Sequence, residues 1–182
     1  MSQYLTHHFL IAMPQMDDPH FQHSVIYIAE HDEKGAFGFI LNKPIQMSMQ
    51  MLMQQANIET QLDNNPKLRY GGPVGQDQAF VLYRPEPEFT ANLLNPDIAL
   101  SNSMETLKSI ALGLGPTQYI SCLGYTGWTA NQLEKEIKEN IWITVEADSL
   151  MIWDYPIEDL RTNALKKLKI DESMLYKMGG SC

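Results

Sequence analysis

Cysteine is scarce in this chain of 182 residues, which contains two, Cys122 and Cys182. Two cysteines so far apart form neither the closely spaced framework of a disulfide-stapled domain nor the paired spacing of a zinc site. We therefore expect cysteine to supply no structural cross-link and no metal ligand set.

Positive charge is also limited, with 13 lysines and arginines against 22 aspartates and glutamates and a net charge of −9. The longest basic run is the pair Lys166-Lys167. Proteins that hold nucleic acid or anionic lipid need clustered cations to neutralise phosphate groups. The composition therefore predicts no generic binding to nucleic acid and no membrane partner.

Long apolar runs are missing too, since none approaches the roughly 18 to 20 residues that span a bilayer. The polar start Met1-Ser2-Gln3-Tyr4 lacks the basic and apolar blocks of a signal peptide. We expect a cytoplasmic protein with one domain over residues 1–182, because this length fits a single core. Glycines near the end predict a flexible tail over residues 177–182.

Apolar periodicity predicts a mixture of strands and helices. The expected strands cover residues 8–13, 24–29, 36–41, 67–70, 78–83, 98–100, 119–123 and 141–146. The expected helices follow capping residues and cover about 48–56, 103–112, 129–139 and 156–168. Because strands and helices do not alternate strictly, this order favours an α+β fold over a doubly wound sheet.

Short motifs follow one another through most of the chain: His7–Pro14, Asp18-Pro19, Ser24-Val25, Glu30-His31, Gly35-Ala36, Asn42-Lys43-Pro44, Gly71–Val74, Phe80–Leu82, Leu123–Tyr125, Trp128, Gln132–Ile137 and Asn140–Trp142. In this order they resemble the YqgE/AlgH family of bacterial proteins over about residues 4–170. The resemblance implies an α+β fold whose mixed, bifurcated β-sheet curls toward a pseudo-barrel, with helices packed around it. It implies no catalytic residues, because the family's activity is largely uncharacterised; one branch is labelled as a transcriptional regulator.

Polar residues at the ends of the expected 24–41 hairpin are the first candidate site. Glu30 and His31 follow one strand, and Asn42 and Lys43 follow the next. A carboxylate beside an imidazole can tune the imidazole pKa for proton transfer. We expect these four residues to line a ligand-binding cleft; the alternative is a structural polar cluster that closes the hairpin.

Two glycine-containing segments are the second candidate. Gly71, Gly72 and Pro73 precede a strand and match neither standard phosphate-loop pattern, which favours a structural turn. Gly124, Tyr125 and Thr126 are expected to form a turn between a strand and a helix, where free N–H groups can bind an anion. If the protein binds a small molecule, we expect one of these segments to join the hairpin ends in the pocket.

The strongest metal candidate is His20-x-x-His23 with Asp17 or Asp18. These residues lie in an expected loop, where their spacing does not bring both imidazoles to one side. Because the rest of a ligand shell is also missing from the sequence, we expect no bound metal and no cofactor.

Without a nucleophile and partner base, a ligand set or a cofactor motif, the sequence favours a small binding or interaction protein without catalysis. Its partner would be a protein or a small molecule. Two alternatives remain open. One is a regulator that acts directly or indirectly on gene expression. The other is a hydrolase that uses Glu30, His31 and Asn42, because a catalytic site can be assembled from distant positions.

Overall fold

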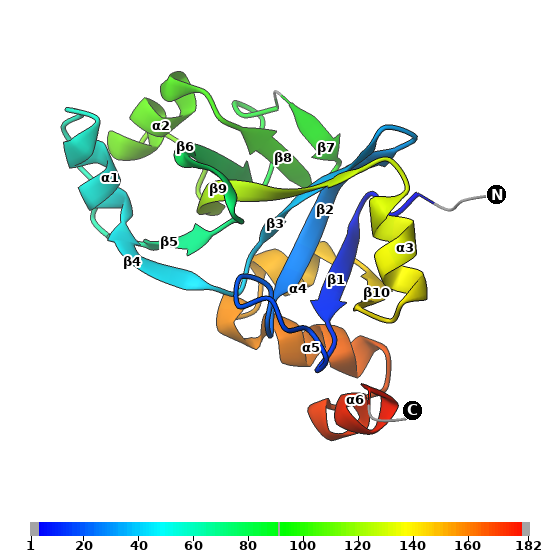
Figure 1. Ribbon diagram of the computed structural model, residues 1–182. Helices are drawn as coiled ribbons and strands as arrows, with labels where there is room; N and C mark the ends of the chain where they lie inside the picture. Colours follow the sequence, from blue (N-terminus) through cyan, green and yellow to red (C-terminus); the bar gives the residue numbers. More distant parts are fainter. Residues whose placement is uncertain (1–3, 91, 180–182) are drawn as a thin grey trace.

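The structure is a computed structural model that describes residues 4–90 and 92–179 (Figure 1). Its strands are β1 (His8–Ala12), β2 (Val25–Asp32), β3 (Gly35–Ile40), β4 (Pro44–Ser48), β5 (Lys67–Tyr70), β6 (Val74–Tyr83), β7 (Leu93–Asn95), β8 (Ile98–Ser101), β9 (Tyr119–Thr129) and β10 (Trp142–Glu146). Its helices are α1 (Met49–Gln55), α2 (Met104–Ala111), α3 (Gln132–Lys138), α4 (Ser149–Trp153), a 3₁₀ turn (Ile157–Asp159), α5 (Leu160–Lys167) and α6 (Glu172–Gly179).

The first two helices begin where short hydroxyl side chains supply an acceptor. Ser48 Oγ accepts the backbone N–H of Met51 at 3.3 Å, and Ser103 Oγ accepts that of Thr106 at 3.1 Å. Each bond satisfies one of the free N–H groups at a helix start. Both capping residues expected from the sequence are confirmed.

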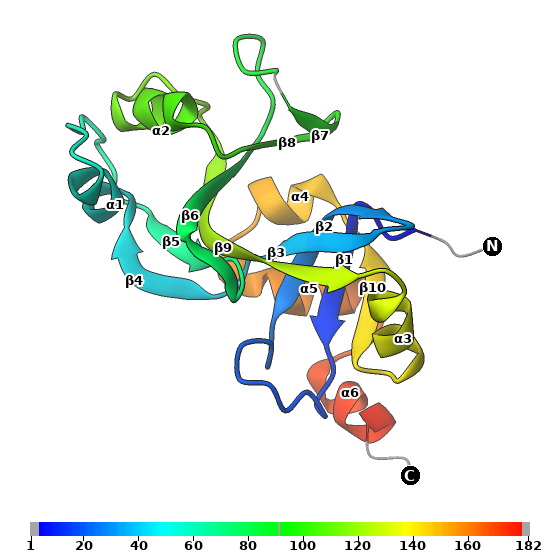
Figure 2. The same cartoon turned by 45° about the horizontal axis from the view of Figure 1, so that its top comes forward.

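The ten strands form one sheet in the order β10-β1-β2-β3-β9-β6-β8-β7, with β4 attached through β5. The long strand β9 is the branch point: its last four residues pair with β3, and its earlier residues pair with β5 and β6. The β5–β9 pair is parallel and the other described pairs are antiparallel, so the sheet is mixed and bifurcated. Figure 2 shows the β6–β8–β7 branch curling away from β1–β3 into a half-barrel, which confirms the expected α+β fold.

Three apolar clusters stabilise this arrangement by removing hydrocarbon surface from water. The largest lies inside the curl and joins side chains of β1, β2, β3, β6 and β9 to α4 and α5. A second cluster packs α3 against the other face of β1–β3, and a third packs α1 and α2 near β5 and β6. The helices therefore cover both faces of the sheet, as Figure 1 shows for α1 and α2 at one end and α3 at the other.

Polar contacts of His7 connect β7 to the β1–β2 side and help to close the curl. Its Nδ1 atom lies 2.6 Å from the Tyr27 hydroxyl oxygen and 3.2 Å from Asn95 Nδ2. Asn95 Nδ2 can only donate, so Nδ1 is an acceptor and the Tyr27 hydroxyl, whose pKa is raised by burial, donates to it as well. Burial lowers the pKa of His7, which agrees with a neutral ring; a backbone hydrogen bond with Leu94 opposes that shift.

The expected turn at Gly124-Tyr125-Thr126 is wrong, because these residues lie inside β9. Gly124 has φ 70°, and the pairing of β9 with β6 shifts in register between Val74 and Ala79. This bulge bends the strand without ending it, since the residues that follow pair with β3.

The helix expected to begin at Thr129 begins at Gln132 instead, after Asn131 with φ 64°. One half of the expected capping box forms, because Thr129 N donates to Gln132 Oε1 at 3.0 Å. Residues 177–179, the first part of the expected flexible tail, belong to α6. Burial of Leu175 in the main core orders that helix; residues 180–182 lie outside the described residues.

No helix among the described residues is both long enough and apolar enough to cross a membrane.

Candidate functional site

The two ends of the β2–β3 hairpin lie far apart. His31 pairs with Ala36 next to the turn, whereas Ile26 pairs with Ile40 close to Asn42 at the open end. Five residues of extended strand separate the two pairings, a length of roughly 16 Å. The expectation that Glu30-His31 and Asn42-Lys43 meet in one cleft is therefore wrong, because an antiparallel hairpin keeps its ends apart.

His31 is 4% exposed, and both of its ring nitrogens are engaged. Leu5 N donates to His31 Nδ1 at 2.9 Å, so the ring proton is on Nε2, which lies 3.2 Å from Glu134 Oε1. The Tyr4 ring stands edge-on to the imidazole at a centroid distance of 5.3 Å. These contacts agree with a structural role for His31 rather than with a role as a general base. The polar cluster joins the hairpin to the N-terminal segment and to α3, and does not merely close the hairpin.

Asn42 and Lys43 hold the loop that precedes β2. Asn42 Oδ1 accepts the N–H of Val25 at 2.8 Å, and its Nδ2 donates to the His23 carbonyl at 2.9 Å. Lys43 Nζ donates to the His20 carbonyl at 2.9 Å. Burial lowers the pKa of Lys43, while the nearby Asp18 carboxylate opposes that shift. Both side chains are thus used to fix backbone.

The two glycine-containing segments lie against each other. Gly71 N donates to the Leu123 carbonyl at 2.9 Å, and a Cβ built on Gly71 would lie 2.1 Å from the carbonyl oxygen of Gly124. A Cβ on Gly72 would lie 2.2 Å from the Tyr125 carbonyl oxygen. Glycine is required here because two backbones approach too closely for any side chain. This close packing supports the structural-turn interpretation of Gly71, Gly72 and Pro73.

The histidines of the metal candidate have other contacts. The His20 ring stacks on Tyr70 with 5.8 Å between centroids, and its Nδ1 lies 2.6 Å from the Tyr70 hydroxyl oxygen. The His23 backbone has φ 59°, and its carbonyl accepts from Asn42. Among residues 4–90 and 92–179, no three His, Cys, Asp or Glu side chains are grouped as a metal site requires.

Two other potentially reactive side chains are inaccessible. Cys122 is fully buried, and burial raises the pKa of its thiol to about 12, which keeps the unreactive protonated form. Thr126 is 2% exposed within β9, where no turn presents its hydroxyl. Neither residue resembles an activated nucleophile.

A cavity of about 410 Å³ lies between the β2–β3 hairpin and the β7–β8 branch. We name it the mouth recess and define it by its lining residues, Glu30, Phe37, Phe80, Asn92, Leu93, Leu94, Leu100 and Asn102. Tyr125 packs against two of these residues: its ring centroid lies 6.4 Å from that of Phe37 and 5.8 Å from that of Phe80. Glu30 and Tyr125 are thus the two predicted site residues that lie at or beside the mouth recess.

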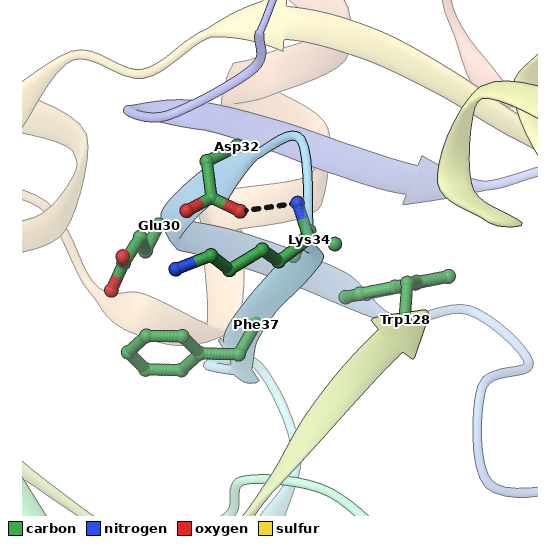
Figure 3. Close-up of a pocket in the computed structure, with 7 residues that line it drawn as sticks. Glu30, Asp32, Lys34, Phe37 and Trp128 are labelled. Atoms are coloured by element: carbon green, nitrogen blue, oxygen red, sulfur yellow. Dashed lines mark hydrogen bonds between the residues drawn. The ribbon is translucent and has the colours of Figure 1, made fainter. Parts of the chain in front are cut away.

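A second hollow, of about 310 Å³, continues from Glu30 and Phe37 toward the hairpin turn (Figure 3). Figure 3 shows the Lys34 side chain lying between Asp32 and the Phe37 ring, with its amine directed toward Glu30. Asp32 Oδ1 accepts the Lys34 backbone N–H at 2.7 Å, which fixes the turn. Charged groups therefore gather at one end of the apolar mouth recess.

Sequence reasoning missed most of the residues that line the mouth recess. Phe37 and Phe80 were expected as ordinary strand residues, and residues 92–94 were assigned to no strand or helix. Alternation along a strand assigns a residue to a face, but it does not tell whether that face is filled. The apolar pair Leu93-Leu94 between two asparagines was the available signal, and it becomes informative once both leucines are found to line the same cavity as Phe37.

A family model described as AlgH-like matches residues 9–173. This chain belongs to the AlgH-like family. A UPF0301 protein from Azoarcus sp. strain BH72 is 43% identical over 179 residues, covering 97% of this chain and 95% of the relative. A UPF0301 protein from Photobacterium profundum is 39% identical over 178 residues, covering 94% and 95%. The earlier resemblance is thereby confirmed.

Solved structures support the same AlgH-like fold. The solution structure of the AlgH protein from Pseudomonas aeruginosa matches with a TM-score of 0.77 at 36% identity over 100% of both chains. The crystal structure of protein DIP2367 from Corynebacterium diphtheriae matches with a TM-score of 0.74 at 19% identity, covering 96% of this chain and 92% of that one, and shows the fold alone. These matches assign no activity to the AlgH-like chain, so its function is inferred from geometry.

Proposed function

We propose that this AlgH-like protein binds a small molecule, or a single apolar side chain of a partner, in the mouth recess without transforming it. The observation that supports this proposal is the composition of the recess. Five apolar or aromatic side chains, those of Phe37, Phe80, Leu93, Leu94 and Leu100, line a space in which Glu30 and two asparagines offer polar contacts. Binding sites for small ligands commonly combine an apolar lining with a few polar groups and lie at barrel mouths.

The size and exposure of the recess suit such a ligand. Its volume of about 410 Å³ falls within the range of small-molecule sites. Leu93, half of whose surface is exposed, stands at its edge. An apolar ligand that covers Leu93 and the Phe37 ring would gain roughly 25 cal/mol for each Å² of apolar surface removed from water.

The polar groups indicate the character of the ligand. Glu30 is an exposed carboxylate, so it favours a ligand with a hydrogen-bond donor at that end. Asn92 and Asn102 can each donate and accept. Because the chain carries a net charge of −9, an anionic ligand is disfavoured, and so is direct regulation through nucleic acid. Any effect on gene expression would then be indirect.

The absence of catalysis is inferred from how the reactive groups are used. His31 is held by Leu5 and Glu134, and Asn42 is held by Val25 and His23. The alternative function, a hydrolase, would need His31 free to transfer a proton, and these hydrogen bonds disfavour that role. A buried free thiol at Cys122 also suits the reducing cytoplasm, where we place the protein.

The proposal is tested by titrating the full chain with the neutral apolar dye Nile red and following its fluorescence. Leu93→Lys places a charge at the rim of the recess. Leu114→Lys is the matched control, because Leu114 is an even more exposed leucine, at 69%, beyond the end of α2. Loss of about 1 kcal/mol of apolar contact weakens binding about fivefold.

We expect the dye to bind saturably, the Leu93→Lys variant to weaken binding at least about fivefold, and the Leu114→Lys variant to bind normally. Equal binding by both variants would contradict the assignment of the site. Lost binding in the Leu114→Lys variant alone would move the apolar site to the α1–α2 end of the molecule.

A further inference from the structure

Apart from the mouth recess and the hollow beside it, a further recess of about 260 Å³ lies where α3 meets the end of β9 and the start of β10. We name it the tryptophan recess. Its lining residues are Met16, Asp18, Phe21, Thr126, Gly127, Trp128, Gln132, Glu136, Ile141 and Trp142. It shares no lining residue with the mouth recess, so it is a separate candidate site. Its volume equals that of roughly eight water molecules in the liquid.

The centre of the recess is the Glu136 carboxylate, which accepts three hydrogen bonds. Trp128 Nε1 and Trp142 Nε1 both donate to Oε2, at 2.8 and 2.7 Å, and Gln132 Nε2 donates to Oε1 at 2.9 Å. All three donors are neutral. They fix the carboxylate in place and leave its negative charge without compensation from these partners.

Two indole rings meet this charge with their N–H edges, and a phenyl ring packs beside one of them. The rings of Trp128 and Trp142 are 6.2 Å apart at 80°, and those of Phe21 and Trp142 are 5.8 Å apart at 83°. In a perpendicular pair the edge of one ring covers part of the face of the other, so Trp128 and Trp142, which are 7% and 4% exposed, offer only narrow strips of ring surface to the recess. A cation near such rings is attracted by their π-electrons, most strongly by tryptophan, and quaternary ammonium groups are recognised in this way.

The charge balance of the lining also favours a cation. Asp18 adds a second carboxylate, while the described residues that line the recess include no lysine, arginine or histidine. Lys43 lies near Asp18 and interacts with it, but its ammonium group is held by the carbonyls of Pro19 and His20. The charge of Asp18 is thus partly balanced from outside, and the charge of Glu136 is not balanced by its hydrogen-bond partners.

We propose that the tryptophan recess binds a small organic ammonium ion, with its methyl or methylene groups against Trp128, Trp142 and Phe21 and its charge facing Glu136. A hard metal ion is disfavoured, because calcium takes six to eight oxygen ligands and this lining offers two carboxylates. A neutral apolar ligand would fill the space but would gain nothing from either carboxylate.

The test compares choline with its uncharged isostere 3,3-dimethylbutan-1-ol at constant ionic strength. Tryptophan fluorescence of the full chain reports binding, because two of the three tryptophans line the recess. Glu136→Gln removes the charge and keeps an oxygen that accepts the indole N–H groups. Asp18→Asn is a second variant, in which an amide oxygen still accepts the His20 N–H, a bond of 2.9 Å in the native protein.

We expect saturable binding of choline, binding of the alcohol at least about tenfold weaker, and about a tenfold loss of choline affinity in Glu136→Gln with a melting temperature close to that of the native protein. Glu30→Gln, in the mouth recess, should bind choline normally, which separates this proposal from the proposed function. Should Glu136→Gln fail to fold, Asp18→Asn should lose affinity in the same direction but by less, because Lys43 already balances part of the Asp18 charge.

The proposal is overturned if choline gives no saturable response, if the alcohol binds as well as choline, or if the folded charge-removing variants keep native affinity. The same ammonium group occurs on free molecules and on trimethylated lysine side chains. A peptide that contains trimethyl-lysine is therefore titrated in parallel, and tighter binding of either probe supports ammonium recognition and identifies its source.

Discussion

Replacing His31 by alanine should destabilise the protein markedly, although this residue carries the chemistry expected of a catalytic base. The imidazole is almost fully buried, with 1% of the side chain exposed. Its removal leaves the Leu5 N–H without its acceptor and Glu134 without its partner. Among the described residues, the other oxygen of Glu134 already has no hydrogen-bond partner, so this carboxylate would lose its one described side-chain contact.

The expected loss can be estimated from these contacts. An unsatisfied buried donor costs about 1 to 3 kcal/mol, and a lost hydrogen bond about 1 kcal/mol more. The cavity left by the ring adds a further cost of roughly 1 kcal/mol. Together they lower the free energy of unfolding by about 3 to 5 kcal/mol. For a chain of this length, that corresponds to a fall of about 6 to 20 °C in melting temperature.

Thermal melting and urea titration, both followed by circular dichroism, measure this change. The matched control is His20→Ala, because His20 is an exposed histidine whose ring makes one hydrogen bond, to Tyr70. We expect the control to lose less than about 1 kcal/mol. If His31→Ala kept native stability while His20→Ala lost it, the structural role assigned to His31 would be refuted and its availability for chemistry would be open again.

Three further changes should follow from the packing. Gly124→Ala should lower the free energy of unfolding by more than about 2 kcal/mol, because the new Cβ would lie 2.5 Å from a carbonyl oxygen. Gly113 has the same φ of 70° but lies in open space, so Gly113→Ala should lower it by about 1 kcal/mol. Urea titration of both variants measures the difference. Arg161→Met should lower the melting temperature by several degrees. The buried guanidinium pairs with the Glu172 carboxylate of α6 and donates to the Ala12 carbonyl at 3.0 Å, and the variant loses both contacts. An unchanged melting temperature would contradict this. Below about pH 6.5 the unfolded state binds a proton that the partly buried ring of His7 resists, so unfolding free energy should fall as pH falls from 7 toward the depressed folded-state pKa. His7→Asn, which tolerates the φ of 61°, should reduce that pH dependence in melts at pH 7 and 5, and an equal dependence in both proteins would count against it.

Local patterns predicted the elements whose causes are local. Ser48 and Ser103 begin helices because a hydroxyl oxygen meets an N–H three residues later, which is visible in the sequence. Gly124 was misassigned because its backbone is set by a strand that arrives from elsewhere. The same glycine can end a strand or form a bulge, and pairing of the following residues with β3 decides between them.

The candidate site was less predictable, since its members are joined by distant contacts. His31 is hydrogen-bonded to Glu134, which lies 103 residues further along the chain. The indole contacts of Glu136 are closer along the chain, at eight and six residues, but they form only because a short helix turns the chain back between two strands. Phe37 looks like a core residue in a strand, and whether it faces a filled core or a recess depends on where β7 folds. None of these contacts produces a periodic pattern of apolar and polar residues from which it could be predicted.

The most direct test of the proposed binding role is a fragment screen observed by NMR on protein with ¹³C-labelled leucine methyl groups. Neutral and cationic aromatic fragments are added one at a time, and shifted methyl signals locate each bound fragment. The account predicts that neutral fragments shift Leu93, Leu94 and Leu100, which line the mouth recess, and are recovered unchanged. Leu165 lines a different hollow, of about 330 Å³, between α5 and α6. Shifts that gather at Leu165 would contradict the account, and so would chemical alteration of a fragment.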